Sequence, residues 1–284
     1  SIVVNTNTSS FLVQRSLSVA TGEIGKSLER LSTGYRINRA ADDAAGLVIS
    51  ESLRSQARGA AQAASNAQTG VNLLQTAEGD LGIIHENLQR MRDLAVQAAN
   101  GTYGTTERAA VEQEVQARID EIDRIAKSSK FNTINLLAGD SSGDKLVLQT
   151  GPDNTDNLNT ISINYGVNDA LGSATSSSLS VKLTTGTGTD ATFASSDNVR
   201  SYISKIDSAI ATISTKRAKI GSLQNRLESA VKSLSIKQEN MSAAESRIRD
   251  VDVAKEAASL TKNQILQQAS AQLLAQANQA PQIA

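Results

Sequence analysis

The sequence has 284 residues, a net charge of −1 at pH 7 and no cysteine, and aromatic residues make up only 2% of it. The near-neutral charge argues against nucleic-acid binding, and the missing cysteine excludes thiol catalysis, disulfides and cysteine-bound metals. No apolar run reaches the roughly 18–20 residues that span a bilayer, so no membrane insertion is expected. With two prolines and few aromatic residues, Ala, Leu, Ile and Val must form the core, which favours long unbroken helices.

The first 33 residues predict a weakly amphipathic helix. Its apolar face is narrow, and an isolated helix of this kind is marginal in water, so we expect it to gain order by packing on other chains. This N-terminal stretch lacks the basic region and continuous apolar segment of a secretory signal peptide. Cytoplasmic residence and export without a signal peptide both remain open. The packing residues of this helix are Leu17, Ile24, Leu28 and Leu31.

Two adjacent carboxylates, Asp42 and Asp43, stand in the segment RINRAADDAAG at 36–46. A metal site would require ligands from elsewhere, and none is visible in the sequence. An aspartate before AAGLVISESL can instead cap a new helix, after a helix stop at glycine and a bend at asparagine. The two arginines of the segment can pair with either acid, within or between subunits. We interpret the segment as an inter-domain joint formed by Gly34, Arg36, Asn38, Arg39, Asp42 and Asp43.

A seven-residue stripe of Leu and Ala predicts a long helix between about 53 and 95. Its apolar positions are Leu53, Ala60, Ala67, Leu74, Leu81, Leu88 and Ala95. His85, the single histidine, lies on the neighbouring seam position, and Gln89 stands where a helical zinc site would need a second histidine. There is no phosphate-binding glycine motif. The sequence therefore predicts no catalytic residue, no metal site and no cofactor.

A turn-rich break, NGTYGTTER at 100–108, precedes a shorter apolar pattern that predicts a helix ending near Ser129. The short connection indicates that this helix packs back as an antiparallel neighbour. From about 131 to 196, Ser, Thr, Gly and Asn dominate and apolar residues alternate. KLVLQTG at 145–151 and the alternating segments 161–165 and 179–183 predict short strands or hairpins, with a glycine-rich turn at 184–190.

The longest heptad repeat begins at Val199 and continues to Ile248. Every seventh residue is apolar, which predicts a coiled-coil helix of about 50 residues. A last, weakly amphipathic helix follows. Its predicted packing residues are Leu260, Leu266 and Leu273.

Four segments of the chain closely resemble the signatures of bacterial flagellin. They are LERLSTGYRINRAADDAAGLVIS at 28–50, NLQRMRDLAVQAANGT at 87–102, EIDRIAKSSKFN at 121–132, and AAESRIRDVDVAKEAASLTKNQILQQASAQLLAQANQ at 243–279. They span both ends of the chain in the correct order and leave only about 140–195 outside the pattern. The chain ends at NQAPQIA, where flagellins of this type usually add several apolar residues, so weaker innermost contacts are expected.

The resemblance implies a mainly α fold, a long antiparallel coiled-coil rod with a small β-hairpin region and paired N- and C-terminal helices. Residues 1–40 with 247–284 would form an inner tube domain, and 41–246 an outer rod domain. The rod would contain a short variable β region at about 131–196, and no large extra outer domain is expected.

The resemblance also implies a structural subunit, not an enzyme, that self-assembles into the helical flagellar filament used for swimming. Export would use the flagellar type III route, which needs no cleaved signal peptide, and would place the protein in the extracellular filament. Its partners would be further copies of itself, an export chaperone, the filament cap and the hook-junction proteins. A hook–filament junction protein is the alternative, because it shares related termini.

Finally, the resemblance suggests recognition by the flagellin-sensing Toll-like receptor of animals. The matching positions are Arg90 and Leu94 in LQRMRDLAV and Glu114 in VEQEVQARIDEID. The same residues resemble an axial contact surface between subunits of a filament.

Overall fold

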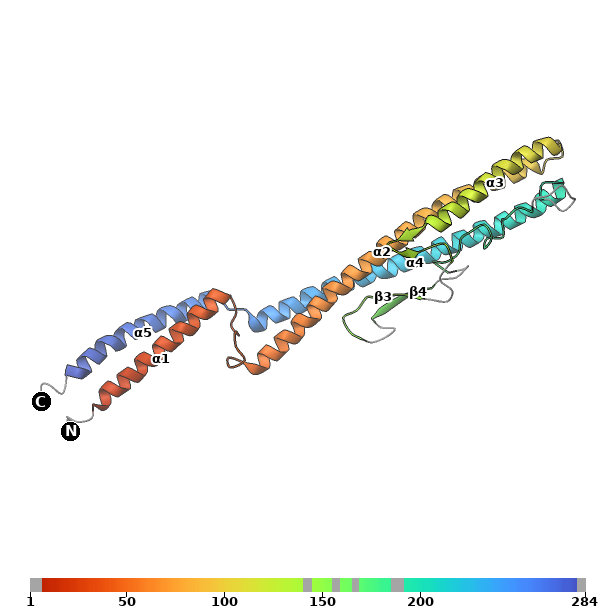
Figure 1. Cartoon of the computed structure of the whole chain (residues 1–284). Helices are drawn as coiled ribbons and strands as arrows, with labels where there is room; N and C mark the ends of the chain where they lie inside the picture. Colours follow the sequence, from red (N-terminus) through yellow and green to blue (C-terminus); the bar gives the residue numbers. More distant parts are fainter. Residues whose placement is uncertain (1–6, 140–144, 155–158, 165–168, 185–191, 280–284) are drawn as a thin grey trace. The chain divides into compact units, whose positions relative to one another are not determined.

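The computed structural model describes residues 7–139, 145–154, 159–164, 169–184 and 192–279. The chain divides into two compact units, Ser1–Arg58 with Gln238–Ala284, and Gly59–Lys237. The predicted mainly α fold with a small β region is confirmed (Figure 1). Its helices are α1 (Thr8–Thr33), α2 (Ala44–Ala98), α3 (Thr105–Ser128), α4 (Ser196–Arg249) and α5 (Val253–Gln279).

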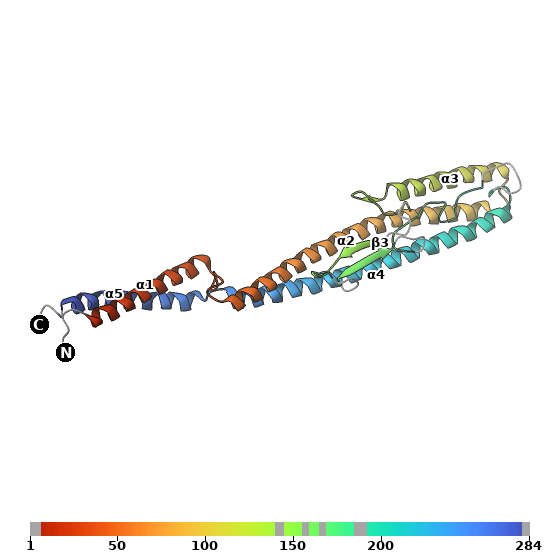
Figure 2. The ribbon, with the colours of Figure 1, turned by 60° about the horizontal axis from the view of Figure 1, so that its bottom comes forward.

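In the first unit, α1 and α5 lie side by side and antiparallel, as both views show (Figures 1 and 2). The amide of Asn7 caps α1 by accepting from the backbone N–H of Ser10 at 3.1 Å, and also donates to the carbonyl of Ala277 at 2.7 Å. Near the middle of the pair, Gln267 donates to Thr21 at 3.1 Å. Few side chains are buried between the two helices, namely Ala20 and Ser27 of α1 and Ser270 of α5.

The second unit is built on the apolar seam between α2 and α4, and buried residues of α3 pack into the same core. The predicted heptad stripes line this core from Ala67 to Ala95 in α2 and from Val199 to Leu227 in α4. Leu81, Leu88 and Ile213 are completely buried there. Ion pairs flank the seam, with Arg92 to Asp207 at 2.7 Å and Arg217 to Glu78 at 3.7 Å. The third helix ends at Ser128, at the position expected from the sequence.

The β region consists, within the described residues, of two antiparallel pairs. Strands β3 (Lys145–Gln149) and β4 (Thr160–Asn164) pair with Leu146 opposite Ile163. The side chain of Leu148 packs over Gly70 of α2, where an added Cβ would lie 2.4 Å from its methyl group. The missing side chain at this glycine therefore lets the hairpin approach the helix closely.

The alternating segment 179–183 is not a strand, so that prediction was wrong. Its backbone turns, with the N–H of Val181 donating to the carbonyl of Ser176 at 3.0 Å and Ser180 at a φ of 59°. The alternation reflects burial against α4, because the hydroxyl of Tyr202 donates to the carbonyl of Val181 at 2.6 Å. Conversely, a short pair that the sequence reading missed joins β1 (Lys130–Phe131) to β2 (Ile134–Asn135). Residues 185–190 of the predicted turn lie outside the described residues, and so does Tyr165.

One buried cation in the second unit holds the segment that follows the hairpin. Lys216 of α4 is completely buried, and its ammonium donates to the carbonyl of Asp169 at 3.1 Å. The exposed Lys219 pairs with the carboxylate of the same aspartate at 3.2 Å. Burial lowers the pKa of Lys216 to about 8, against the smaller opposing effect of the Asp169 charge.

Replacing this lysine should change how the free energy of unfolding depends on pH. Because the pKa of Lys216 is lower in the folded chain than its ordinary value of 10.5, the unfolded chain binds more protons between these values, and stability rises with pH there. The Lys216→Met variant should lack this increment of at most about 3 kcal/mol. Chemical denaturation between neutral and alkaline pH measures it, with Lys219→Met as the exposed control. Parallel pH profiles for wild type and Lys216→Met would contradict the assignment.

Candidate functional site

Two chain segments cross within the first unit, after the end of α1 and after the end of α4. We call residues 34–43 and 249–252 the crossover. Tyr35 and Asp250 form an antiparallel bridge. On either side of it, the N–H of Arg36 donates to the carbonyl of Arg249 at 2.6 Å, and the N–H of Val251 donates to that of Gly34 at 3.0 Å. Gly34, the residue after α1, has a φ of 76°. This left-handed backbone conformation ends the helix and favours glycine.

Arginine side chains strengthen the crossover from both segments. The guanidinium of Arg36 donates to the carbonyl of Ile248 from Nε at 3.2 Å and from Nη2 at 2.5 Å, which satisfies a free carbonyl at the end of α4. Arg249 donates to Glu51 of α2 at 2.7 Å and lies over the ring of Tyr35, 4.8 Å from its centre. The Arg249 side chain is only 13% exposed, so this pair is shielded from water on one side.

The paired acids act as backbone caps. Asp42 accepts from the N–H groups of Asn38 at 3.2 Å and Arg39 at 3.0 Å, and these bonds lower the pKa of its carboxyl group. Asp43 accepts from the N–H of Gly46 at 2.9 Å and so caps the start of α2, as the sequence suggested. Among the residues that the structure describes, no group of three His, Cys, Asp or Glu side chains could hold a metal ion.

The expected pairing of the two arginines with the two acids does not occur within this chain. Arg39 reaches back to Glu29 of α1, with N–O distances of 3.1 and 3.3 Å, while Arg36 binds a backbone carbonyl. The carboxylates of Asp42 and Asp43 are occupied by neighbouring backbone N–H groups, which are closer in sequence and need no long side chain to be ordered. The six residues predicted for the joint therefore do gather here, but in different pairs.

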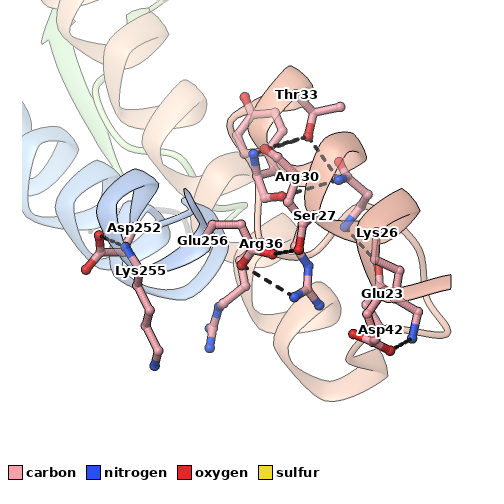
Figure 3. A network of polar contacts seen from close by, with 12 residues as sticks. Glu23, Lys26, Ser27, Arg30, Thr33, Arg36, Asp42, Asp252, Lys255 and Glu256 are labelled. Atoms are coloured by element: carbon pink, nitrogen blue, oxygen red, sulfur yellow. Dashed lines mark hydrogen bonds and ion pairs between the residues drawn. The ribbon is translucent and has the colours of Figure 1, made fainter. Parts of the chain in front are cut away.

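A second polar cluster ties the start of α5 to the end of α1 (Figure 3). Glu256 accepts from the hydroxyl of Ser27 at 2.6 Å and lies 3.7 Å from the guanidinium of Arg30. Asp252 caps α5 by accepting from the N–H of Lys255 at 3.1 Å. Sequence reasoning missed Glu51, Arg249 and Glu256. The arginine in the last turn of α4 was the available signal, because cations favour helix C-termini.

Beside these polar clusters, the α1–α5 pair exposes many large apolar side chains. A groove of about 430 Å³ runs along it, bounded by Leu12 and Val19 of α1 and Leu266 of α5. Of the predicted packing residues, Leu17, Ile24, Leu31 and Leu260 are half-buried, whereas Leu28, Leu266 and Leu273 are exposed. The exposed large apolar residues of the pair are Phe11, Leu12, Val19, Leu28, Val253, Ile265, Leu266 and Leu273.

The three residues predicted for receptor and axial contacts lie in the second unit. Arg90 and Glu114 are exposed and form an ion pair between α2 and α3, with an N–O distance of 3.0 Å. Leu94 is only 3% exposed and belongs to the helical core. Its assignment as a direct surface contact is therefore corrected, because its side chain packs among the buried apolar residues of the second unit.

Across the described helices, none is long and apolar enough to cross a bilayer. The chain matches two family models over most of its length. These are the bacterial flagellin N-terminal helical region at residues 4–142 and the bacterial flagellin C-terminal helical region at residues 203–283.

Individual relatives agree with the family models. Flagellin FlaB1 of Treponema pallidum (strain Nichols) is 40% identical over 292 residues, covering 99% of this chain and 98% of the relative. The flagellin of Bacillus subtilis (strain 168) is 44% identical over 276 residues, covering 90% of each. A putative flagellar hook-associated protein from Vibrio parahaemolyticus shares the fold, with a TM-score of 0.57 over 74% of this chain and all of that chain, but only 16% identity.

Full-length identity to flagellins near 40%, against 16% to the hook-associated protein, does not favour a hook-junction protein. The family is one of structural proteins. The chain belongs to the bacterial flagellin family, and it is a structural subunit of the flagellar filament.

Proposed function

We propose that the α1–α5 pair is the main assembly surface of the filament subunit, buried by the same helices of neighbouring subunits. The observation that carries this proposal is the shortage of a core between the two helices. Only Ala20 and Ser27 of α1 and Ser270 of α5 are buried, while eight large apolar side chains are exposed. A monomer normally avoids so large an exposed apolar area, and such a patch indicates an interaction surface.

The energetics support the proposal. Burying a Leu, Ile, Val or Phe side chain completely contributes roughly 1.5–3 kcal/mol. The eight residues are already partly shielded, so their burial would contribute on the order of 10 kcal/mol per subunit before the cost of ordering is subtracted. Polar bonds between α1 and α5 are few and mostly exposed, and exposed pairs contribute about 1 kcal/mol or less. The terminal helices thus gain far more from neighbouring subunits than from each other.

We also propose that the crossover is the joint between the terminal domain, 1–40 with 247–284, and the remaining domain, 41–246. Both connections between these domains pass through it. The backbone bridge at Tyr35 and Asp250 and the pair between Arg249 and Glu51 would hold the two connections in one register. A fixed joint would let every subunit enter the filament with the same geometry.

The exposed terminal helices also suggest how the subunit is handled before assembly. We propose that an export chaperone covers the apolar face of α5, and that the filament cap and hook-junction proteins meet the same helices. Export through the flagellar type III route would deliver the subunit to the extracellular filament. No catalytic role is proposed, because the family is one of structural proteins.

Recognition by the animal flagellin-sensing Toll-like receptor is proposed for Arg90 and Glu114 only. Both are exposed, on adjacent helices, and joined as one ion pair, so a partner could read them together. Leu94, being buried, would support the helix beneath them rather than touch a partner.

Placing a charge on the apolar face should block assembly without unfolding the monomer. Leu266 of α5 is 46% exposed, so Leu266→Asp should change the free energy of unfolding by only about 0.5 kcal/mol. In the filament the new carboxylate would be buried without a partner, and polymerisation should be lost. Light scattering and electron microscopy measure this, with Gln268→Asp on an exposed position of the same helix as the matched control. Normal filaments from Leu266→Asp, or equal loss in both variants, would contradict the proposed surface.

Acid should loosen the crossover through Glu51. The bond from Arg249 lowers the pKa of Glu51 below its ordinary value of 4.5, so its stabilising effect is present above that value and is lost as pH falls through the lower folded pKa. At neutral pH, Glu51→Gln should reduce hydrogen-exchange protection of the Arg36 and Val251 amides, which donate across the crossover. The difference from wild type should vanish in acid.

The matched control for this experiment is Glu239→Gln. Glu239 is an exposed residue of α4 and makes no ion pair with the residues that the structure describes. Its substitution should leave protection of both amides unchanged at either pH. If Glu51→Gln behaves in the same way at neutral pH, the pair with Arg249 does not hold the crossover.

A further inference from the structure

The turn between α2 and α3 contains Asn100–Gly101, the one Asn–Gly pair in the 284-residue sequence. Helix α2 ends at Ala98 and α3 begins at Thr105, so the pair lies outside regular structure. Both residues are exposed. An exposed Asn–Gly pair outside regular structure can undergo a reaction that filament assembly does not require.

An asparagine side chain can be attacked by the backbone nitrogen of the residue that follows it. The attack requires a nitrogen that is accessible and not already engaged as a hydrogen-bond donor. The N–H of Gly101 makes no hydrogen bond with the described residues. A Cβ added at this glycine would meet nothing within 4 Å, so open space surrounds the nucleophile.

The side chain of Asn100 points forward along the chain. Its Oδ1 accepts from the N–H of Thr102 at 3.4 Å, so the amide group lies on the side of the residues that follow it. The same contact draws electron density from the amide carbon and would stabilise negative charge on Oδ1. The backbone around it remains a loose turn, with Asn100 and Tyr103 donating to carbonyls at 3.3 and 3.2 Å.

We propose that Asn100 is a site of spontaneous deamidation. The Gly101 nitrogen gives its proton to solvent base and forms a bond to the Asn100 side-chain carbon. The bond from that carbon to the amide nitrogen breaks, and the nitrogen leaves as ammonia after protonation by water. Water then adds to either carbonyl of the resulting five-membered imide and opens it to aspartate or isoaspartate at position 100. The sequence of steps needs only water and base, with no oxidant or enzyme.

The other asparagines outside the helices offer a comparison. Asn132 is also exposed and lies in a turn, with a φ of 55°, but Thr133 follows it. The branched side chain of threonine shields the backbone nitrogen that would attack. Asparagines inside helices, such as Asn72 and Asn225, are held by regular backbone hydrogen bonding. Asn132 is therefore an internal control for Asn100 within the same molecule.

The products would alter the end of α2. A new carboxylate would stand just beyond the C-terminus of the helix, where free carbonyl groups already create a negative end. Isoaspartate would also lengthen the main chain between Ala99 and Tyr103, which both pack against the core of the second unit. The reaction takes place within a turn of one subunit and therefore does not depend on assembly.

The test is incubation of the purified full chain at physiological temperature at several pH values, followed by peptide mapping with mass spectrometry and isoaspartyl methyltransferase labelling. We expect the acid and isoaspartyl forms to accumulate at position 100, about tenfold faster for each pH unit because the deprotonated amide rises in that proportion. Asn132 should remain amidated over the same period.

The Gly101→Ala variant tests the nucleophile directly. Gly101 does not have a positive φ and has open space around it, so alanine fits without strain, and circular dichroism should match wild type. The variant should slow conversion at Asn100 severalfold, and Asn100→Ser should abolish isoaspartate at this turn. Conversion of Asn100 no faster than that of Asn132, or an unchanged rate in a folded Gly101→Ala variant, would overturn the proposal.

Discussion

Burial of one apolar seam holds the second unit together, and the positions of its other elements depend on it. Leu81 and Leu88 of α2 face the heptad stripe of α4, where Ile213 and Ile220 are also completely buried. Each such side chain contributes roughly 1.5–3 kcal/mol, whereas each exposed ion pair along the seam contributes about 1 kcal/mol or less. The apolar stripe therefore provides most of the stability of the seam. Helix α3, the hairpin and the turn at 176–181 all use the same surface.

The terminal helices have the same kind of heptad pattern but lack enough apolar width to complete a core. Ala20, Ser27 and Ser270, the buried residues between them, are small and contribute little on burial. What remains outside, including Leu12 and Val19 beside the groove, is therefore available to other copies of the chain. The small size of the buried side chains of α1 and α5 thus explains why the second unit has a core of its own, whereas the α1–α5 pair leaves large apolar side chains exposed.

The crossover provides hydrogen-bond partners for backbone groups that are left free where two chain segments leave the helices. Backbone bonds on either side of Tyr35 and Asp250 satisfy some of them, and Arg36 satisfies the carbonyl of Ile248. Asp42 and Asp43 satisfy further N–H groups of the turn and of α2. Asp42 and Asp43, which could be taken for a metal or acid–base site in the sequence, therefore act as backbone caps between α1 and α2.

The sequence by itself determined the helices, their long heptad stripes, the caps of the joint and the family, because these depend on local spacing and on long contiguous motifs. The stripes at Leu81 and Ile213 specify an inward face wherever the helix lies. Only the tertiary structure decided which partners the charged residues take, since Arg39 could reach Glu29 as easily as a neighbouring aspartate. It also decided that 179–183 is not a strand, although Leu179, Val181 and Leu183 are buried, and that Leu94 lies in the core. Alternation and motif position indicate which side chains are buried, but they do not say which neighbour covers them.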